Sequence, residues 1–127
     1  MRDVNNRLMI VIFLGVVIIV SGCTSEQEVD PETEKFAQCL KESGVKMYGS
    51  FTCSVCKRQI ELFGSAFESV GEIECHPRGE NPQTELCLEK DISKTPTWTL
   101  EKDGVELERL EGFQSFEKLS ELSGCKL

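Results

Sequence analysis

The sequence predicts an α/β domain in which short strands alternate with amphipathic helices. Apolar residues recur at helical spacing in several segments, and short apolar or alternating runs lie between them. A Cys-x-x-Cys motif, Cys53 to Cys56, stands where one such run ends and a helical pattern begins. The expected order of elements is helix, strand, helix, strand, helix, strand, strand, helix.

The first half of the domain is expected to contain two helices and the strand between them. The first helix begins around Asp30 and Pro31, because proline and acidic residues favour a first turn, and it ends at Gly44. A strand over residues 44–51 follows. The next helix is predicted by apolar positions at i, i+4, i+7 and i+11, namely Cys56, Ile60, Phe63 and Phe67.

The second half is expected to contain three strands and two helices. Residues 72–75 form a short strand, and residues 82–90 form a short helix. Two strands within 96–110 flank an Asp-Gly hairpin turn, and Val105 and Leu107 alternate with glutamates, which predicts one solvent-facing side. The final helix has an apolar stripe and ends near Gly124; the stripe comprises Phe113, Phe116, Leu119 and Leu122.

The N-terminal residues form a separate region. Residues 1–23 combine Arg2 and Arg7 with an apolar run, 8–20, that is typical of a signal peptide and short for a membrane span. The run ends in Val-Ser-Gly-Cys, which resembles a lipobox, so Cys23 is expected to carry lipid; an uncleaved signal anchor is the alternative. Residues 24–33 are an acidic tether and 34–127 the folded domain. Both alternatives place the domain in the cell envelope, membrane-anchored and facing outside the cytoplasm.

Charge and cysteine content narrow the possible functions. The formal net charge is −8 and no basic cluster is present, which argues against binding to nucleic acid. Of seven cysteines, an even number remains when Cys23 is set aside, and an exported domain of this size favours disulfides among them. Spacing alone does not say which cysteines pair.

The folded part resembles the thioredoxin-like domain of vitamin K epoxide reductase homologues. The matching segments are GVKMYGSFTCSVCKRQIELFG, IECHPRGENPQTELC, TPTW and the terminal LSELSG. The resemblance implies a thioredoxin fold, with an about four-stranded mixed sheet flanked by helices and an extra N-terminal helix. It also implies a redox-active Cys53–Cys56 disulfide with no bound cofactor.

The two cysteines of the motif are expected to differ. Cys53 falls at a helix N-terminus, where free N–H groups and nearby Lys57 and Arg58 favour a thiolate, whereas Cys56 lies on the buried stripe. Thiol–disulfide exchange uses such an asymmetry between attacking and resolving sulfurs. The resemblance further implies a cis Pro96 facing the motif and a Thr95 backbone that pairs with bound substrate.

The remaining cysteines are expected to form structural bridges. The resemblance implies a Cys75–Cys87 disulfide, with a relay of electrons to or from the motif as the alternative. Cys39 and Cys125 lie outside the family pattern. Because an N-terminal helix can pack near the last helix of this fold, their joint presence suggests a bridge between the two ends.

The expected activity is thiol–disulfide exchange with exported proteins. A vitamin K epoxide reductase-like, quinone-linked membrane oxidase would reoxidise the cysteine pair. The alternative is a disulfide reductase, in which the same residues catalyse the reverse reaction. A non-enzymatic copper or zinc carrier is the other alternative. The spacing of Cys53, Cys56, Cys75 and Cys87 loosely resembles a zinc ribbon. His76 raises the possibility of copper, but the copper carriers that it brings to mind have three residues between their cysteines, so His76 is expected to be a solvated loop histidine. The helical stripe and an oxidising compartment argue against four metal-binding thiolates, so no metal site is expected.

Overall fold

The computed structural model describes residues 29–127. The predicted signal segment, Cys23 and tether residues 24–28 lie outside the described residues. Within the part that is described, none of the helices combines the length and the apolar character needed to cross a bilayer.

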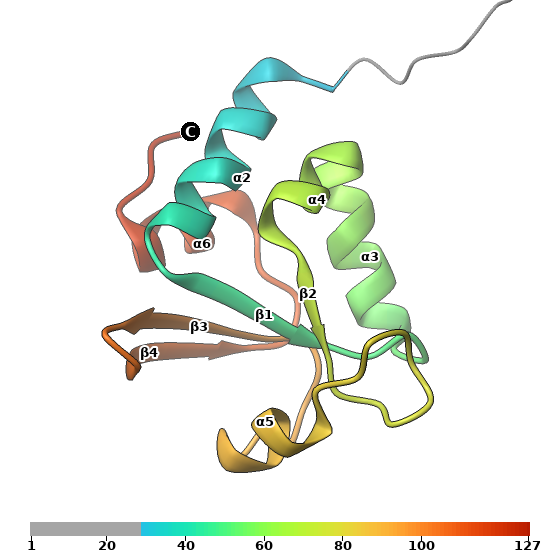
Figure 1. Ribbon diagram of the computed structural model, residues 1–127. Coiled ribbons are helices and arrows are strands. Elements are labelled where there is room, and N and C mark those ends of the chain that lie inside the picture. The colour runs from blue at the N-terminus through green and yellow to red at the C-terminus, as the bar shows by residue number, and fades with distance from the viewer. Residues whose placement is uncertain (1–28) are drawn as a thin grey trace, which may run out of the picture.

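A four-stranded mixed sheet forms the centre of the domain (Figure 1). Its strands are β1 (Val45–Gly49), β2 (Glu72–Glu74), β3 (Thr97–Lys102) and β4 (Val105–Glu111), in the spatial order β2-β1-β3-β4. β1 and β2 run parallel, whereas β3 pairs antiparallel with both β1 and β4. This sheet and the order of elements confirm the α/β fold predicted from the sequence.

Helices cover both faces of the sheet unequally. One face carries α2 (Pro31–Glu42), α3 (Ser54–Phe63), α4 (Phe67–Val70) and α6 (Phe116–Ser123), with a 3-10 turn, Gly64–Ala66, joining α3 to α4. The short helix α5 (Thr84–Glu89) lies alone on the other face (Figure 1). The helix α2 is the extra N-terminal helix, and it already includes residues 31–33, at the end of the predicted tether.

Local sequence determines where the first and last helices begin. The Asp30 carboxylate accepts the Thr33 N–H at 3.1 Å, and Pro31 occupies the first turn of α2, where no N–H is required. Ser115 caps α6 by accepting the Lys118 N–H at 3.3 Å, and this cap leaves Phe113 outside the helix. The predicted stripe therefore loses its first member, and Phe113 is exposed on the preceding loop.

The hydrophobic core fills the space between the sheet and the four helices. Phe63 lies at its centre, because its ring packs against four other aromatic rings, those of Phe36, Phe67, Trp98 and Phe116. Leu40, Met47 and Leu119 are completely buried around them. This core fixes α3, and with it the cysteine motif, against strands β1 and β3.

The opposite face of the sheet is polar and centres on Glu101, which is 7% exposed. Its carboxylate accepts hydrogen bonds from Tyr48 at 2.9 Å, Thr99 at 3.0 Å, Lys46 at 2.8 Å and Lys90 at 3.3 Å. Burial works to raise the pKa of Glu101, but the hydrogen bonds from Lys46, Tyr48 and Thr99 outweigh it and lower the pKa to about 2. The ion pairs join β1 and β3 to the end of α5.

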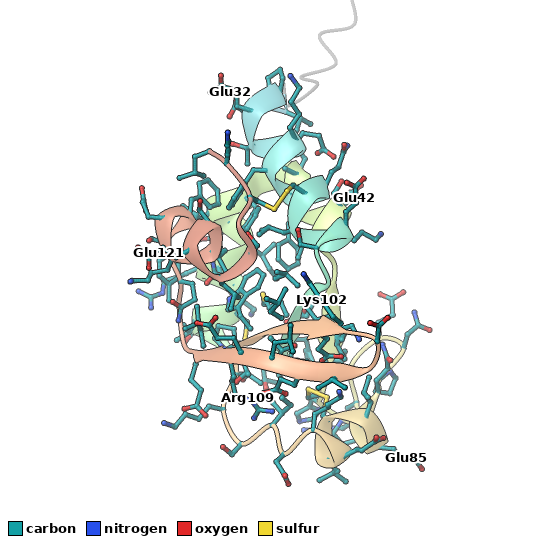
Figure 2. The ribbon with its side chains drawn as sticks, turned by 90° about the vertical axis from the view of Figure 1, so that its left-hand side faces the viewer. Glu32, Glu42, Glu85, Lys102, Arg109 and Glu121 are labelled. Atoms are coloured by element: carbon teal, nitrogen blue, oxygen red, sulfur yellow. A yellow bond between two sulfur atoms is a disulfide. The ribbon has the colours of Figure 1, made fainter. Side chains whose placement is uncertain are left out.

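The alternation on β4 does not place its apolar residues inside, which corrects the prediction for this strand. Val105 and Leu107 are more than half exposed, while Glu106 is half-buried and paired with Arg109 at 2.7 Å. A register shift between Leu100 and Glu101 inserts an extra residue in β4 and changes which side chains face α5. Arg109 also donates to the Lys90 carbonyl at 2.6 Å, on the α5 side of the hairpin (Figure 2).

Candidate functional site

A tight turn between β1 and α3 presents the first cysteine of the motif. The Cys53 N–H donates to the Ser50 carbonyl at 2.9 Å, which closes a turn over residues 50–53. Cys53 is the N-cap of α3, and its sulfur accepts the Cys56 N–H at 3.1 Å. The sulfur of Cys53 is thus fixed at the positive end of the helix.

The two thiols lie in different environments. Cys53 is partly exposed, whereas Cys56 is only 1% exposed, one turn into the helix. Burial works to raise the pKa of Cys53, but hydrogen bonds from the Cys56 thiol and from backbone amides at the helix start outweigh it, so this pKa lies below its ordinary value. Burial, and then the hydrogen bond with Cys53, raise the pKa of Cys56 to about 12.

The positive side chains near the motif have a smaller part than the sequence suggests. Lys57 and Arg58 are exposed, and the Arg58 guanidinium lies 5.7 Å from the centre of the Phe113 ring. Hydrogen bonds from the Cys56 thiol, from Thr95 and from the first backbone amides of α3 account for the lowered pKa of Cys53. The thiolate is therefore favoured by hydrogen bonds from the Cys56 thiol and Thr95 first, and by backbone amides of the helix start after them.

The segment before β3 meets the cysteine motif in space. The Thr95–Pro96 peptide bond is cis, and the Cys53 thiol donates to the Thr95 carbonyl at 3.4 Å. The Pro96 carbonyl in turn accepts the Gly112 N–H at 2.8 Å, which ties the segment to the end of β4. Residues 42 positions apart in the sequence are thereby brought into contact at the exposed sulfur.

Gln59 connects α3 to its neighbours beside the cysteine motif, and the sequence pattern did not indicate that it is buried. Its side chain is completely buried on α3, between the apolar positions of the predicted stripe. Its carbonyl accepts the Gln114 N–H at 2.7 Å and the Trp98 indole N–H at 3.3 Å, and its amide donates to the Gln114 carbonyl at 3.0 Å. These bonds attach α3 to β3 and to the loop before α6.

Two glutamates on β2 also belong to the surroundings of the motif and were missed. Glu72 and Glu74 alternate with Ile73 and pair in register with Met47 and Gly49, so both point towards the α3 face. Glu74 is 7% exposed and accepts backbone N–H groups from both neighbouring loops. Only the alternation of a very short strand could have indicated these positions in the sequence.

Within residues 29–127 the structure contains two disulfides, with the pairing that the sequence analysis expects. Cys39 joins Cys125 between α2 and the end of α6, and Cys75 joins Cys87 between β2 and α5 (Figure 2). Cys53 and Cys56 are the free cysteines among the described residues. Because Cys75 and Cys87 are bonded to each other, they do not supply thiolates for the zinc-ribbon alternative.

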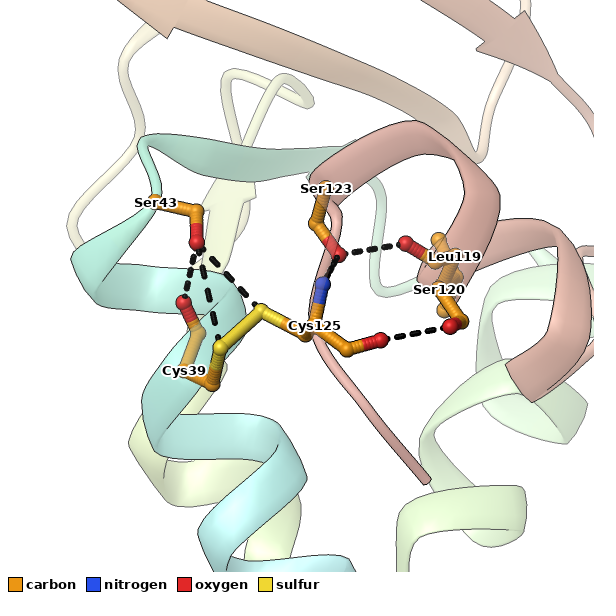
Figure 3. The surroundings of a disulfide bond; sticks show 6 residues. All are labelled: Cys39, Ser43, Leu119, Ser120, Ser123 and Cys125. Atoms are coloured by element: carbon orange, nitrogen blue, oxygen red, sulfur yellow. Dashed lines mark hydrogen bonds between the residues drawn. A yellow bond between two sulfur atoms is a disulfide. The ribbon is translucent and has the colours of Figure 1, made fainter.

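Hydrogen bonds surround the Cys39–Cys125 bridge (Figure 3). The Ser43 hydroxyl donates to the Cys39 carbonyl at 2.8 Å and lies 3.3 Å from the Cys125 sulfur. The Cys125 N–H donates to the Ser123 hydroxyl at 3.0 Å, and the Ser120 hydroxyl donates to the Cys125 carbonyl. This bridge lies beside the helices and away from the turn that presents Cys53.

His76 does not belong to a group of metal ligands. Its Nδ1 accepts the Arg78 N–H at 3.1 Å, and its ring lies edge-on to Phe51 with a centroid distance of 5.1 Å. Across residues 29–127, the structure brings no three histidine, cysteine, aspartate or glutamate side chains close enough together to hold a metal ion.

Comparison with known sequences finds similarity to a curated oxidoreductase, and no protein-family model matches the chain. The chain is 35% identical over 101 residues to the thiol-disulfide oxidoreductase LTO1 of Arabidopsis thaliana. The aligned region makes up 76% of this chain but only 26% of the relative. The chain thus spans about a quarter of the length of the curated relative that it matches.

Comparison with solved structures finds thioredoxins. The structure of Plasmodium falciparum thioredoxin is similar with a TM-score of 0.50 and 17% identity, covering 66% of this chain and 85% of that one. Fasciola hepatica thioredoxin gives a TM-score of 0.48 and 18% identity, covering 68% and 88%. Together with the mixed sheet β2-β1-β3-β4 and its flanking helices, the first of these similarities shows that the chain has a thioredoxin fold.

Proposed function

We propose that this protein is a thiol–disulfide oxidoreductase that acts through Cys53 and Cys56. The observation that supports it most directly is the asymmetry of the two free thiols. The sulfur with the lowered pKa is partly exposed at the start of α3, and the sulfur with the raised pKa is buried beside it. The similarity to a thiol-disulfide oxidoreductase over 101 residues supports the same activity.

The exchange reaction is divided between the two cysteines. A substrate thiolate attacks the Cys53 sulfur of the Cys53–Cys56 disulfide, the bond to Cys56 breaks, and the Cys56 sulfur leaves as a thiolate and takes up a proton. A second substrate thiolate then attacks the substrate sulfur of the mixed disulfide and releases the Cys53 thiolate. The substrate gains one disulfide, and two electrons remain on the cysteine pair.

The local geometry suits each of these steps. The Cys53 thiolate is a good leaving group, because its pKa lies below that of an ordinary cysteine and the Cys56 N–H donates to it. The Thr95 carbonyl, which lies 3.4 Å from the Cys53 sulfur, is positioned to accept a backbone N–H from an extended substrate segment. We infer that Thr95 and Pro96 align the substrate sulfur with Cys53.

The cellular setting belongs to the same proposal. We infer that lipid on Cys23, or an uncleaved signal anchor, holds the domain on the outer side of the cytoplasmic membrane. No bound cofactor is needed, because the cysteine pair itself carries the electrons. A vitamin K epoxide reductase-like membrane oxidase, linked to quinone, would reoxidise the pair and make the protein an oxidant of exported thiols. Confinement to one membrane raises the effective concentration of the two partners.

A single-turnover experiment tests the activity. The full chain, with its Cys53–Cys56 pair oxidised, is mixed with an unfolded peptide that contains two reduced cysteines. We expect one peptide disulfide per protein molecule and the loss of the Cys53–Cys56 disulfide, both measured by mass spectrometry. Cys53→Ser should abolish the reaction. Cys56→Ser, mixed instead with the oxidised form of the peptide, should accumulate a mixed disulfide, because the Cys53 thiolate attacks the peptide disulfide, releases one peptide thiolate and has no Cys56 thiol to resolve the product. Unchanged peptide oxidation by Cys53→Ser would refute the proposal.

Trapping thiols in cells by acid and alkylation decides the direction and the partner. An oxidant should be found mainly as the Cys53–Cys56 disulfide and should become reduced when the membrane oxidase is removed. A reductase would be mainly in the dithiol form even when quinone is abundant. Mass spectrometry of the membrane-extracted protein should show a chain that begins at a diacylglycerol-modified Cys23, whereas an intact chain beginning at Met1 would indicate a signal anchor.

A further inference from the structure

A buried carboxylate joins the turn before the cysteine motif to the loop after β2. Glu74 is 7% exposed, and each of its carboxylate oxygens accepts a different backbone N–H. One oxygen accepts the Phe51 N–H at 2.9 Å, and the other accepts the His76 N–H at 2.6 Å. Such charge-assisted bonds are shorter and stronger than bonds between neutral groups.

The bond to Phe51 acts on the turn that presents Cys53. The turn over residues 50–53 is closed by the bond from the Cys53 N–H to the Ser50 carbonyl. Phe51 is the second residue of this turn, so its own N–H is not used in closing it. Glu74 supplies the acceptor for that N–H and so connects the turn to β2.

The bond to His76 connects the same carboxylate to a loop that is held firmly in place. The loop over residues 76–83 lies between the bonded cysteines Cys75 and Cys87, and the Gln83 N–H donates to the Glu74 carbonyl at 2.8 Å. Gly79 lies directly against the Glu74 side chain, because a Cβ at this position would be only 2.3 Å from the Glu74 Cδ. Figure 1 shows this loop beside the start of α3.

The side chains at the two ends of this link also touch. The Phe51 ring meets His76 edge to face, with an angle of 85° between the rings. Glu74 therefore adds a polar side-chain link between two segments that are otherwise joined by this ring contact and by the bond from the Cys75 N–H to the Gly49 carbonyl at 2.9 Å. Its carboxylate is the polar connection between the fixed loop and the turn of Cys53.

We propose that Glu74 is a positioning residue for Cys53, through which the loop closed by the Cys75–Cys87 disulfide holds the turn that presents the reactive sulfur. Without the carboxylate the Phe51 N–H loses its acceptor, the turn gains freedom, and the Cys53 sulfur is less often aligned with the Cys56 N–H. The thiolate then loses part of its stabilisation. The inference rests on the proposed role of Cys53 as the reacting sulfur.

The test measures the reactivity of Cys53 alone, in the full chain with Cys56→Ala. We expect Glu74→Gln to slow alkylation of Cys53 by iodoacetamide at pH 7 by roughly three- to tenfold, since the thiolate fraction falls when its pKa rises. At a pH where Cys53 is fully ionised, the rates should converge. Glu74→Asp keeps the charge but is too short to accept both N–H groups, so it should also slow alkylation. This variant replaces Glu74→Gln in the test if the glutamine variant does not fold.

Glu101→Gln is the matched control. It also alters a buried carboxylate with several hydrogen-bond donors, but on the α5 side of the sheet, so it should lower stability without changing alkylation of Cys53. The double variant Cys75→Ala/Cys87→Ala should slow alkylation as Glu74→Gln does. Combining it with Glu74→Gln should add little, because both changes act through the same contact.

Three results would overturn the proposal: an unchanged alkylation profile in folded Glu74→Gln, an equal slowing in Glu101→Gln, or fully additive effects of Glu74→Gln and the double cysteine variant. Alkylation requires no disulfide exchange with a protein substrate. A failure of the positioning role is therefore distinguishable from a failure of the proposed oxidoreductase function, which the single-turnover experiment measures.

Discussion

At the scale of single residues, the behaviour of each thiol follows from its position in the first turn of α3. Cys53 stands before the helix and accepts one of the N–H groups that have no partner within it. Cys56 lies one turn later, where the same helix directs its side chain into the core. A spacing of three residues is thus sufficient to give one exposed thiol with a lowered pKa and one buried thiol with a raised pKa.

Selective alkylation tests this difference. In the protein with its cysteine pair reduced, iodoacetamide at pH 7–8 should modify Cys53 and leave Cys56 unmodified, because Cys56 has a pKa of about 12 and stays protonated. Mass spectrometry of the digested protein gives the modified position. In the control variant Cys53→Ser, Cys56 should remain almost unreactive over the same period. Faster modification of Cys56 would reverse the assigned roles.

Glu72 is a second acid on β2, half-buried and in a less favourable position than Glu74. A Cβ on Gly49 would lie 1.8 Å from the Glu72 Oε1, so the glycine leaves the space that this carboxylate occupies. The Oε1 atom has no hydrogen-bond partner among the described residues. Burial, and then the neighbouring charge of Glu74, raise the pKa of Glu72, so its ionised form destabilises the folded state.

The sign of the effect of Glu72 on stability follows from this raised pKa. As the pH rises above the pKa of an unfolded glutamate, the unfolded chain ionises first, and the folded state loses stability until Glu72 also ionises. Glu72→Gln should therefore raise the free energy of unfolding at pH 7 and have little effect at pH 3.5, as measured by urea unfolding. Glu74→Gln, two residues away, should lower stability at pH 7. Equal losses in both variants would contradict this account.

At the scale of secondary-structure elements, a polar network around the buried Glu101 carboxylate connects the sheet to the end of α5. Glu101 on β3 receives hydrogen bonds from β1, from its own strand and from the residue that ends α5. Each donor compensates part of the cost of burying the carboxylate. The polar side chains on this face specify how the short helix α5 and the hairpin β3–β4 are placed.

The Glu101 network should make the protein sensitive to acid. Because the pKa of Glu101 is lowered to about 2, its contribution is complete above the pKa of an unfolded glutamate and disappears as the pH falls towards 2. We expect Glu101→Gln to cost about 2–3 kcal/mol at pH 7 and much less at pH 2. Urea unfolding at both pH values measures the difference. A constant cost at both pH values would show that the charge is not responsible.

At the scale of the whole molecule, the two disulfides restrain different parts of the chain. Cys75–Cys87 closes a short segment next to the candidate site, with a sequence separation of 12, whereas Cys39–Cys125 joins residues 86 positions apart. The long bridge connects α2, where the described part of the chain begins, to the residues after α6. It therefore restrains both ends of the domain without touching the turn of Cys53.

Removing the long bridge should reduce stability and leave the chemistry unchanged. In the chain-entropy model, the double variant Cys39→Ala/Cys125→Ala loses about 4 kcal/mol. Denaturant unfolding measures this loss, and alkylation of Cys53 should proceed at the unchanged rate. Peptide mapping without reduction should recover Cys39 and Cys125 as one linked fragment. Free thiols at both positions, or a linkage of either residue to Cys75 or Cys87, would contradict the structure.

The sequence by itself determined the order of elements, the mixed α/β architecture and the position of the Cys53–Cys56 motif at the start of a helix. These features depend on local signals: helical spacing of Phe36, Leu40, Phe63 and Leu119, an Asp-Gly turn, and a Cys-x-x-Cys motif at a strand–helix junction. The family resemblance added the disulfide between Cys75 and Cys87 and the position of a cis Pro96 next to the cysteine motif. Spacing alone could not have chosen among the possible cysteine pairings.

Only the tertiary structure decided which polar residues are buried and what they contact. Glutamine and glutamate usually lie at the surface, yet Gln59, Glu74 and Glu101 are each buried. Each forms hydrogen bonds with a segment that is distant in the chain. The outward position of Leu107 follows from a register shift between β3 and β4, which strand alternation does not reveal. Burial depends on how strands pair and which helices cover them, so a local pattern cannot report it.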